Sequence, residues 1–251
     1  MSDFIAAADR EILARHGLDS FESLWALRLE AVDEPNTGRG GWSSVFRLDL
    51  GEATYYLKRQ SNFLSRNLLR PFGEPTFARE FRNICRYQKL GVPALQAAFF
   101  GYRLVEGERR AILLTRALDG WRELAGWLDA WPAMAAGKRL AIIVAVADLA
   151  RRLHGAGQVH GCFYPKHVFL RETQAGFEAC LIDLEKTRPL LLGRRDRVKD
   201  LEALVRRADA WGEVEVRELL SGYLERGQDS ADVNDWLARL ASRRRDKERA
   251  Q

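Results

Sequence analysis

The feature that most constrains this chain is a change of hydrophobic pattern close to residue 118. Up to that point, short segments alternate apolar and polar residues, which is typical of strands. Beyond it, longer segments follow helical spacing. A strand-rich part followed by a helix-rich part predicts an α+β chain of two lobes, with a ligand expected in a cleft between them. The predicted strands of the first part are Trp25–Val32, Trp42–Leu50, Thr54–Arg59, Leu95–Val105 and Ala111–Thr115.

The first part also contains helical patterns. Residues 1–20 predict a short amphipathic helix that ends at Gly17, and Pro75–Leu90 predicts a longer one. In the second part the predicted helices are Trp121–Asp129, Ala133–His154, 196–210 and segments after 213, with short strands at Val168–Arg171 and Glu178–Ile182. The expected organisation is a helical extension over 1–24, a strand-rich lobe over 25–118 and a helical lobe over 119–251.

Composition narrows the class of protein. Apolar residues make up 47% of the 251 residues and charged residues 30%, which excludes a disordered or fibrous chain. The longest strongly apolar run, Leu140–Leu149, includes Asp148 and is shorter than the roughly 20 residues of a membrane span. Three scattered cysteines (Cys85, Cys162 and Cys180) are too few for a disulfide framework. We therefore expect a soluble protein of a reducing compartment.

Positive charge is unevenly distributed. The net charge of +5 does not indicate nucleic-acid binding. Arginine-rich clusters either face an anionic membrane or substrate or are solvated helix faces. The candidates are Arg66, Arg70, Arg194, Arg195 and Arg197. The Leu64–Pro71 segment is either a membrane-facing or acceptor-facing loop or a simple connection.

Five features follow one another in a meaningful order. A glycine-rich turn between two strands contains Gly38, Gly40 and Gly41, and the next strand carries Lys58. The five features are this turn, Lys58, Glu80 in the following helix, the loop His160-Gly161-Cys162-Phe163-Tyr164-Pro165-Lys166-His167, and Asp183 after an apolar strand.

These features suit phosphoryl transfer. Glycine amides can approach phosphate oxygens closely, because no Cβ intervenes. A lysine supplies a point charge to the phosphates, and a helix glutamate can hold that lysine. A carboxylate near a second ligand suits Mg²⁺ that bridges phosphates. Each feature alone is more often structural, so the hypothesis depends on their order.

On these residues, the chain resembles the bacterial lipopolysaccharide kinase family, which has a protein-kinase-like fold and phosphorylates inner-core sugars. The resemblance covers roughly residues 25–210. Its most specific stretches are His160–Leu170, then Leu181-Ile182-Asp183-Leu184-Glu185-Lys186-Thr187-Arg188, then Arg197-Val198-Lys199-Asp200-Leu201.

The resemblance implies roles for individual residues. Asp183 and His167 match the metal-binding aspartate and loop histidine, and Lys58 and Glu80 match the nucleotide lysine and its helix partner. Asp200 matches the aspartate that braces the catalytic loop. Thr115–Leu118 would be the hinge against which adenine stacks, and Gly38, Gly40 and Gly41 would contact the nucleotide. The candidate catalytic residues are His160, Cys162 and Asp183.

One position departs from the family pattern. Where the family has its catalytic aspartate, this chain has Cys162, and a thiol is a poor substitute for that carboxylate. Either the reaction needs the base only modestly, or another carboxylate serves, or the chain is a nucleotide-binding pseudokinase or scaffold in envelope assembly.

The function implied is an ATP- and Mg-dependent phosphotransferase. Its acceptor would be an anionic glycolipid or core oligosaccharide. Its location would be the cytoplasm, with possible peripheral contact with the inner membrane. A zinc site from His160, Cys162, His167 and Cys180 fits no standard ligand spacing, and nothing else in the chain indicates a Cys–His hydrolase.

Overall fold

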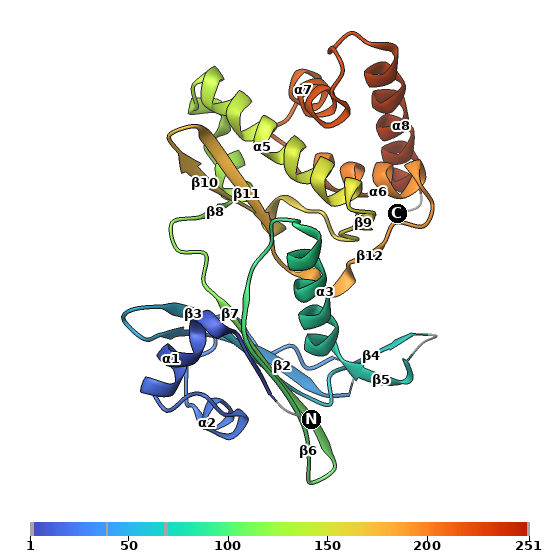
Figure 1. Cartoon of the computed structure of the whole chain (residues 1–251). Coiled ribbons are helices and arrows are strands. Elements are labelled where there is room, and N and C mark those ends of the chain that lie inside the picture. Colours follow the sequence, from blue (N-terminus) through green and yellow to red (C-terminus); the bar gives the residue numbers. More distant parts are fainter. Residues whose placement is uncertain (1–2, 39, 68–69, 250–251) are drawn as a thin grey trace. The chain divides into compact units, whose positions relative to one another are not determined.

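The computed structural model describes residues 3–38, 40–67 and 70–249, without the side chains of residues 66, 67, 70–72, 247 and 248. The chain divides into two compact units, each of which is described by itself (Figure 1). Unit 1 comprises Met1–Gln88 and Leu95–Asp119, and unit 2 comprises Lys89–Ala94 and Gly120–Gln251.

Unit 1 is built on an antiparallel sheet of five strands in the order β1-β6-β7-β3-β2. Its strands are β1 (Phe4–Ile5), β2 (Trp42–Asp49), β3 (Thr54–Ser61), β6 (Ala97–Val105) and β7 (Glu108–Arg116). Four of the five strands predicted in this region are therefore confirmed. Lys58 lies opposite Val45 of β2 and Leu113 of β7, so it occupies an internal strand that is paired on both edges.

Two short helices, α1 (Ala7–Arg15) and α2 (Phe21–Ala26), complete the core of this sheet. Leu13, Phe21 and Leu24 are buried in one cluster with Tyr55 and Leu57 of β3. Burial of apolar side chains on this scale is the main force that fixes such helices to a sheet.

A buried carboxylate also joins α1 to the sheet. Asp9 is 3% exposed and accepts hydrogen bonds from Tyr55 Oη and Arg116 Nε, both at 2.8 Å. The N-terminal segment is thus an integral part of unit 1.

Two local predictions in this region are wrong. Trp25–Val32 is not a strand, because α2 takes up its first two residues. Ser20 caps that helix, its Oγ accepting the Ser23 N–H at 3.1 Å, and only Ala31 pairs, in an isolated bridge with Phe46. Phe4–Ile5, predicted as helix, pairs instead with β6 and covers an otherwise open sheet edge.

The helix predicted over Pro75–Leu90 is α3 (Thr76–Leu90). Gln60 of β3, which is fully buried, fixes its first turn: its Oε1 accepts hydrogen bonds from Thr76 Oγ1 at 2.8 Å and from Phe77 N at 2.9 Å. Phe81 stacks on Phe100 of β6 with ring centroids 4.4 Å apart. The orientation of α3 on the sheet is therefore specified at its start and along one face.

The Leu64–Pro71 segment belongs to a hairpin of β4 (Leu64–Asn67) and β5 (Arg70–Pro75). Residues 68 and 69, and the side chains of Arg66 and Arg70, lie outside what the structure describes. The predicted membrane-facing or acceptor-facing role of this segment therefore stays a prediction.

Unit 2 is mainly helical. Its helices are α4 (Leu124–Asp129), α5 (Ala136–Gly155), α6 (Arg194–Val205), α7 (Glu213–Leu224) and α8 (Ala231–Glu248). Short strands form two small sheets, one of β8 (Arg122–Glu123), β10 (Val168–Thr173) and β11 (Gly176–Leu181), the other of β9 (Gln158–Val159) and β12 (Arg188–Pro189). The predicted helix at Trp121–Asp129 starts later, because Arg122–Glu123 pair with β10.

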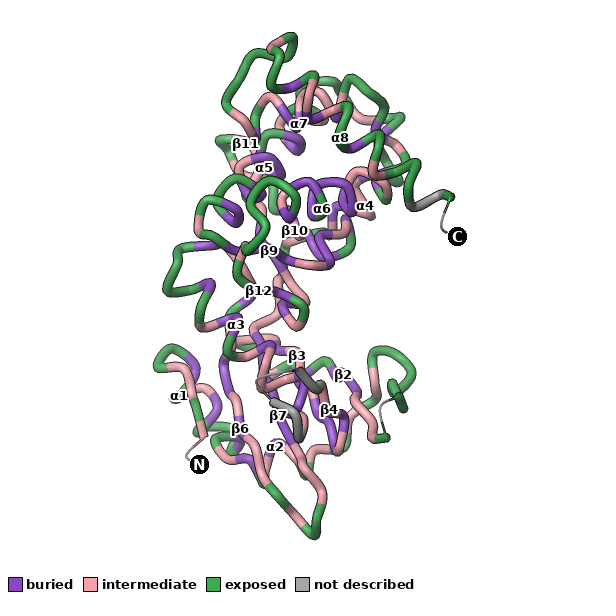
Figure 2. Tube along the Cα trace, turned by 90° about the vertical axis from the view of Figure 1, so that its right-hand side faces the viewer, coloured by how far each residue is buried: buried purple, intermediate pink, exposed green. Residues whose placement is uncertain are grey.

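The central helix α5 is the core of unit 2 (Figures 1 and 2). Ile142, Val146, Leu149 and Leu153 are at most 1% exposed, so this helix is enclosed along much of its length. Within the described part of the chain, no helix combines the length and apolarity required to cross a membrane.

Candidate active site

The loop that follows β9 is fixed by one buried carboxylate. Asp200 of α6 is 1% exposed, and its Oδ2 accepts the His160 N–H at 2.6 Å while its Oδ1 accepts the Gly161 N–H at 3.0 Å. His154 Nε2 lies 3.5 Å from Asp200 Oδ2, and His154 Nδ1 lies 2.9 Å from Tyr223 Oη. Charge-assisted bonds to backbone amides are strong in a buried environment, so the loop has one specified conformation. The bracing contact predicted for Asp200 is present.

His160 is locked in a single neutral tautomer. Its Nε2 lies 2.9 Å from the Ile182 carbonyl and must donate to it, which leaves Nδ1 to accept the Cys162 N–H at 3.3 Å. Burial lowers the pKa of His160, which is 0% exposed. The ring therefore connects the loop to the strand end before Asp183 and acts as a structural link.

His167 and Asp183 form the candidate metal site. His167 Nδ1 lies 2.8 Å from the Cys162 carbonyl and must donate to it, so Nε2 carries the lone pair. That nitrogen lies 3.3 Å from Asp183 Oδ2. Burial is the main cause that lowers the pKa of His167, which favours the neutral ring. Two electron-pair donors thus face each other, an arrangement that a cation would stabilise.

The backbone at Asp183 is unusual. Its φ of 56° and ψ of 62° are left-handed, a conformation that asparagine and aspartate tolerate better than other side chains. Its side chain is 44% exposed, and Asp183 directly precedes the short 3₁₀ helix Leu184–Lys186. The chain therefore turns sharply at the residue whose carboxylate faces His167.

The donor set fits magnesium with a phosphate substrate. Mg²⁺ in such sites is held by one or two protein ligands, while phosphate oxygens and water complete its coordination. Across the described residues there is no group of three or more His, Cys, Asp or Glu side chains that could hold a metal. Cys180, one of the residues of the zinc alternative, lies within β11, and burial raises the pKa of its thiol to about 12.

Cys162 lies inside the loop and is 5% exposed. Its side chain is the largest cause that raises the pKa of Lys186, and, after burial, a hydrogen bond with it raises the pKa of Tyr164. Gly161 packs so closely on Lys186 that a Cβ would lie 2.8 Å from the Lys186 carbonyl oxygen. Sequence reasoning missed Tyr164 and Lys186 as neighbours of Cys162, although both lie within the quoted motifs.

In unit 1, Lys58 and Glu80 form the predicted ion pair, with Lys58 Nζ 2.6 Å from Glu80 Oε1. The Glu80 side chain is 4% exposed and the Lys58 side chain 18% exposed. The lysine ammonium is therefore held from one side by a buried carboxylate and keeps partial access to solvent.

The glycine turn lies before β2. The Gly38 N–H is donated to Asn36 Oδ1 at 3.1 Å, and the Gly41 N–H to the Gly38 carbonyl at 3.2 Å. A Cβ on Gly41 would lie 2.2 Å from the Ser61 carbonyl oxygen, so glycine is required there for packing. Gly40 has a φ of 78°. Residue 39 lies outside the described part of the chain.

The structure thus brings the predicted residues together in two groups. Unit 1 contains the glycine turn, Lys58 and Glu80, and unit 2 contains the loop residues and Asp183. The unit 2 group is His160, Cys162, His167, Asp183 and Asp200.

Comparisons with known proteins add independent findings. A sequence model of the lipopolysaccharide kinase (Kdo/WaaP) family matches residues 22–223. The chain is 34% identical to protein InaA of Escherichia coli (strain K12) over 181 residues, which is 71% of this chain and 82% of InaA. Its fold is similar to that of WaaP in a structure with acyl carrier protein, with a TM-score of 0.70 and 22% identity over 97% of this chain and 99% of that one. The predicted α+β, protein-kinase-like fold class is confirmed.

Proposed function

Because the chain belongs to the lipopolysaccharide kinase (Kdo/WaaP) family, we propose that it transfers a phosphoryl group from ATP, with Mg²⁺, to a sugar hydroxyl of the lipopolysaccharide inner core. The observation that carries the proposal is the His167–Asp183 pair. His167 Nε2 and Asp183 Oδ2 lie 3.3 Å apart, and a bound cation would stabilise both electron-pair donors. Lys58, held by Glu80, is the second support.

Each residue has a role that its surroundings favour. Lys58 would place its ammonium on nucleotide phosphate oxygens, with Glu80 limiting the positions that the side chain can take. Asp183 and His167 would hold Mg²⁺, which supplies charge neutralisation of the phosphates when bound. Asp200 would keep the His160–His167 loop in one conformation, so that the loop residues are already in position before the reaction begins.

Cys162 occupies the position where the family pattern has a catalytic aspartate. We propose that orientation of the acceptor hydroxyl falls to the polar groups around the thiol, Tyr164 and Lys186. A loose phosphoryl-transfer transition state needs little help from a base, which allows slow catalysis without the carboxylate. The acceptor would be an anionic glycolipid or core oligosaccharide. The supply of ATP and the small number of cysteines, three in 251 residues, favour a cytoplasmic location.

The second candidate is a nucleotide-binding pseudokinase that acts as a scaffold, and Cys162 is the observation that favours it. The test is transfer of labelled phosphate from ATP to core-oligosaccharide acceptors of increasing completeness. It compares the wild type with Cys162→Ala and Cys162→Asp. For an active kinase we expect transfer by the wild type and by Cys162→Ala on the same acceptor.

Thermal shift with ATP and Mg²⁺ separates the outcomes. A shift without transfer by the wild type, with transfer appearing only in Cys162→Asp, would establish the pseudokinase. No shift in any of the three proteins would exclude both candidates. The matched control is Cys85→Ala, since Cys85 lies on α3, outside the His160–His167 loop.

A further inference from the structure

A carboxylate clamp holds the chain just before α6. Asp196 is 3% exposed, and its Oδ2 accepts the N–H groups of Leu191 and Leu192, each at 3.0 Å. Arg188 pairs with the same carboxylate in bidentate fashion, at 2.7 and 2.9 Å. These bonds hold the pKa of Asp196 far below its usual range, so the clamp is charged at neutral pH. The segment between β12 and α6 therefore has a fixed backbone.

The clamp presents two leucines to solvent. Leu191 is 74% exposed and Leu192 is 58% exposed, although nearly every other leucine of unit 2 is buried or half-buried. Apolar side chains that a fixed backbone holds in water cost free energy, and this cost is recovered when they contact another apolar surface. Without the Asp196 bonds, the segment could turn its leucines toward the protein. The clamp therefore keeps them exposed.

A groove lined with arginines begins at the same turn. The Arg195 N–H is donated to the Leu192 carbonyl at 3.1 Å, which makes the leucines and the first turn of α6 one piece. Arg194 and Arg195 face Arg239 and Arg243 of α8 across a groove of about 400 Å³. The other lining residues are Val198, Ser242 and Asp246.

Carboxylates near this groove neutralise only part of its charge. Asp235 is shared by Arg194 and Arg239, the second at 3.1 Å. Arg195 is exposed and has no ion-pair partner among the residues that the structure describes. Among its described lining residues, four are arginines and one, Asp246, is acidic, so this lining has an excess of positive charge.

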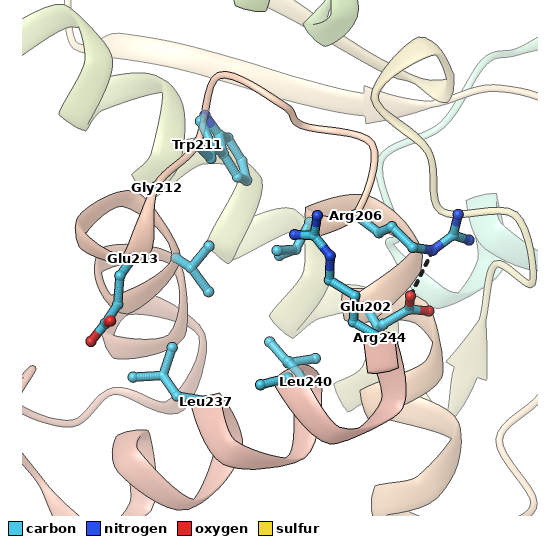
Figure 3. A pocket seen from close by; sticks show the side chains of 11 residues that line it. Glu202, Arg206, Trp211, Gly212, Glu213, Leu237, Leu240 and Arg244 are labelled. Atoms are coloured by element: carbon cyan, nitrogen blue, oxygen red, sulfur yellow. Dashed lines mark hydrogen bonds and ion pairs between the residues drawn. The ribbon is translucent and has the colours of Figure 1, made fainter. Parts of the chain in front are cut away.

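Buried groups orient two of these arginines. The guanidinium of Arg194 lies 5.1 Å from the ring centroid of Trp236. Arg243 Nε lies 3.8 Å from Glu202, which also pairs with Arg206 at 2.7 Å beside the pocket drawn in Figure 3. Glu202 is 2% exposed, so it is a fixed anchor. The cationic lining is thus held in position by buried partners.

We propose that Leu191, Leu192, Arg194, Arg195, Arg239 and Arg243 form one docking surface for an anionic lipid bilayer. The leucines would enter the boundary between headgroups and acyl chains, and the arginines would donate to lipid phosphates. An anionic bilayer is the occupant that requires both features side by side, since a soluble phosphate would leave the leucines in water. The surface lies wholly in unit 2, and the inference does not depend on phosphoryl transfer.

The test is sedimentation of the full chain with vesicles, without ATP. One set contains phosphatidylglycerol and phosphatidylethanolamine in equal parts, and the other contains phosphatidylcholine alone. We expect binding to the anionic vesicles only. Leu191→Ser with Leu192→Ser, and separately Arg195→Glu, should each weaken that binding roughly tenfold. The variant with both leucines replaced by serine would bind through charge alone. Salt at 0.5 M screens charge and should therefore reduce its binding further.

Matched controls lie in unit 1. Leu104 is 69% exposed and Arg10 is exposed on α1, so Leu104→Ser and Arg10→Glu change the same residue types elsewhere. Both controls should bind like the wild type, and all variants should keep the wild-type circular dichroism spectrum. Equal binding by the two test variants and the wild type would overturn the proposal, as would equal losses in the controls. The proposal would also be overturned if the wild type fails to bind anionic vesicles. Loss of that binding in the presence of micromolar tripolyphosphate would overturn it too.

Discussion

The His160–His167 loop of unit 2 and the Lys58 site of unit 1 are held in place by different kinds of contact. In the loop, the backbone amides of His160 and Gly161 are fixed by Asp200, and the rings of His160 and His167 are fixed by carbonyl groups. In unit 1, the lysine ammonium pairs with the Glu80 carboxylate and lies 6.0 Å from the ring centroid of Phe77, so side chains alone hold it.

From this difference we expect the loop contacts to affect mainly the stability of the fold, and the Lys58–Glu80 contact to affect mainly function. Removing a contact in the loop should disturb the fold, because a buried amide or ring loses its partner. Removing the contact in unit 1 should change what Lys58 can reach, with little effect on the sheet that carries it. The predictions below test this contrast, from the largest expected effect to the smallest.

The largest effect should come from Asp183→Asn. It removes the exposed carboxylate that faces His167, and we expect a loss of Mg²⁺-dependent transfer of about a thousandfold, or about 4 kcal/mol in the barrier. Asparagine tolerates the left-handed backbone at this position, so the midpoint of thermal unfolding should not change. Initial rates and a melting curve measure the two quantities. Glu178→Gln, on the exposed face of β11, is the control and should affect neither.

Asp200→Ala should reduce the free energy of unfolding by about 3 kcal/mol, since two buried N–H groups lose their acceptor. Urea unfolding measures it. The control is Asp148→Ala on α5, whose carboxylate is partly exposed and pairs with arginines of its own helix, so about 0.5 kcal/mol or less is expected there. Equal losses in the two variants would show that the loop is not specially fixed.

The third effect in size should be a decrease in the free energy of unfolding at acid pH. Burial depresses the pKa values of His160 and His167 in the folded chain, so the unfolded chain binds more protons below pH 6.5. Their contribution to stability is therefore complete above about pH 6.5 and is lost as the pH falls, by at most about 1.4 kcal/mol per pH unit for each ring. Urea unfolding between pH 5 and 8, without Mg²⁺, measures the slope. His167→Gln should reduce it.

The smallest change in stability should follow Glu80→Gln. Lys58 is partly exposed and can find water, so we expect a loss of about 1 kcal/mol. Transfer from ATP should nevertheless fall at least tenfold, because the ammonium no longer has a fixed position. Glu52→Gln, an exposed partner of Arg15, is the control for stability and activity. A loss of stability as large as that of Asp200→Ala would falsify the contrast between the two places.

Much of the fold was accessible from sequence because its strands and long helices have clear periods. Trp25–Val32 was misread because its alternation resembles a strand, while the signal that decides is local: Ser20 caps a helix that starts at Phe21. Phe4–Ile5 form a strand of two residues, too short for any pattern, and only the free edge of β6 explains it.

The candidate site divides in a similar way. Lys58, Glu80, His167 and Asp183 could be predicted because they lie in motifs with a fixed order along the chain. The pair of His154 with Tyr223 could not, since 69 residues separate its members. The same holds for the clamp at Asp196, because the residue types around it do not show which backbone amides its carboxylate accepts.

The path of the chain also limits how this protein can be dissected. Lys89–Ala94 belong to unit 2, although the chain then returns to unit 1 at Leu95. The Pro93 carbonyl accepts the Leu181 N–H at 3.1 Å, and Ala94 bridges Leu181, two residues before Asp183. A truncated chain that starts at Gly120 would lack these contacts, so unit 2 cannot be separated by a single cut. A circularly permuted or split chain that retains Lys89–Ala94 would be needed to obtain it alone.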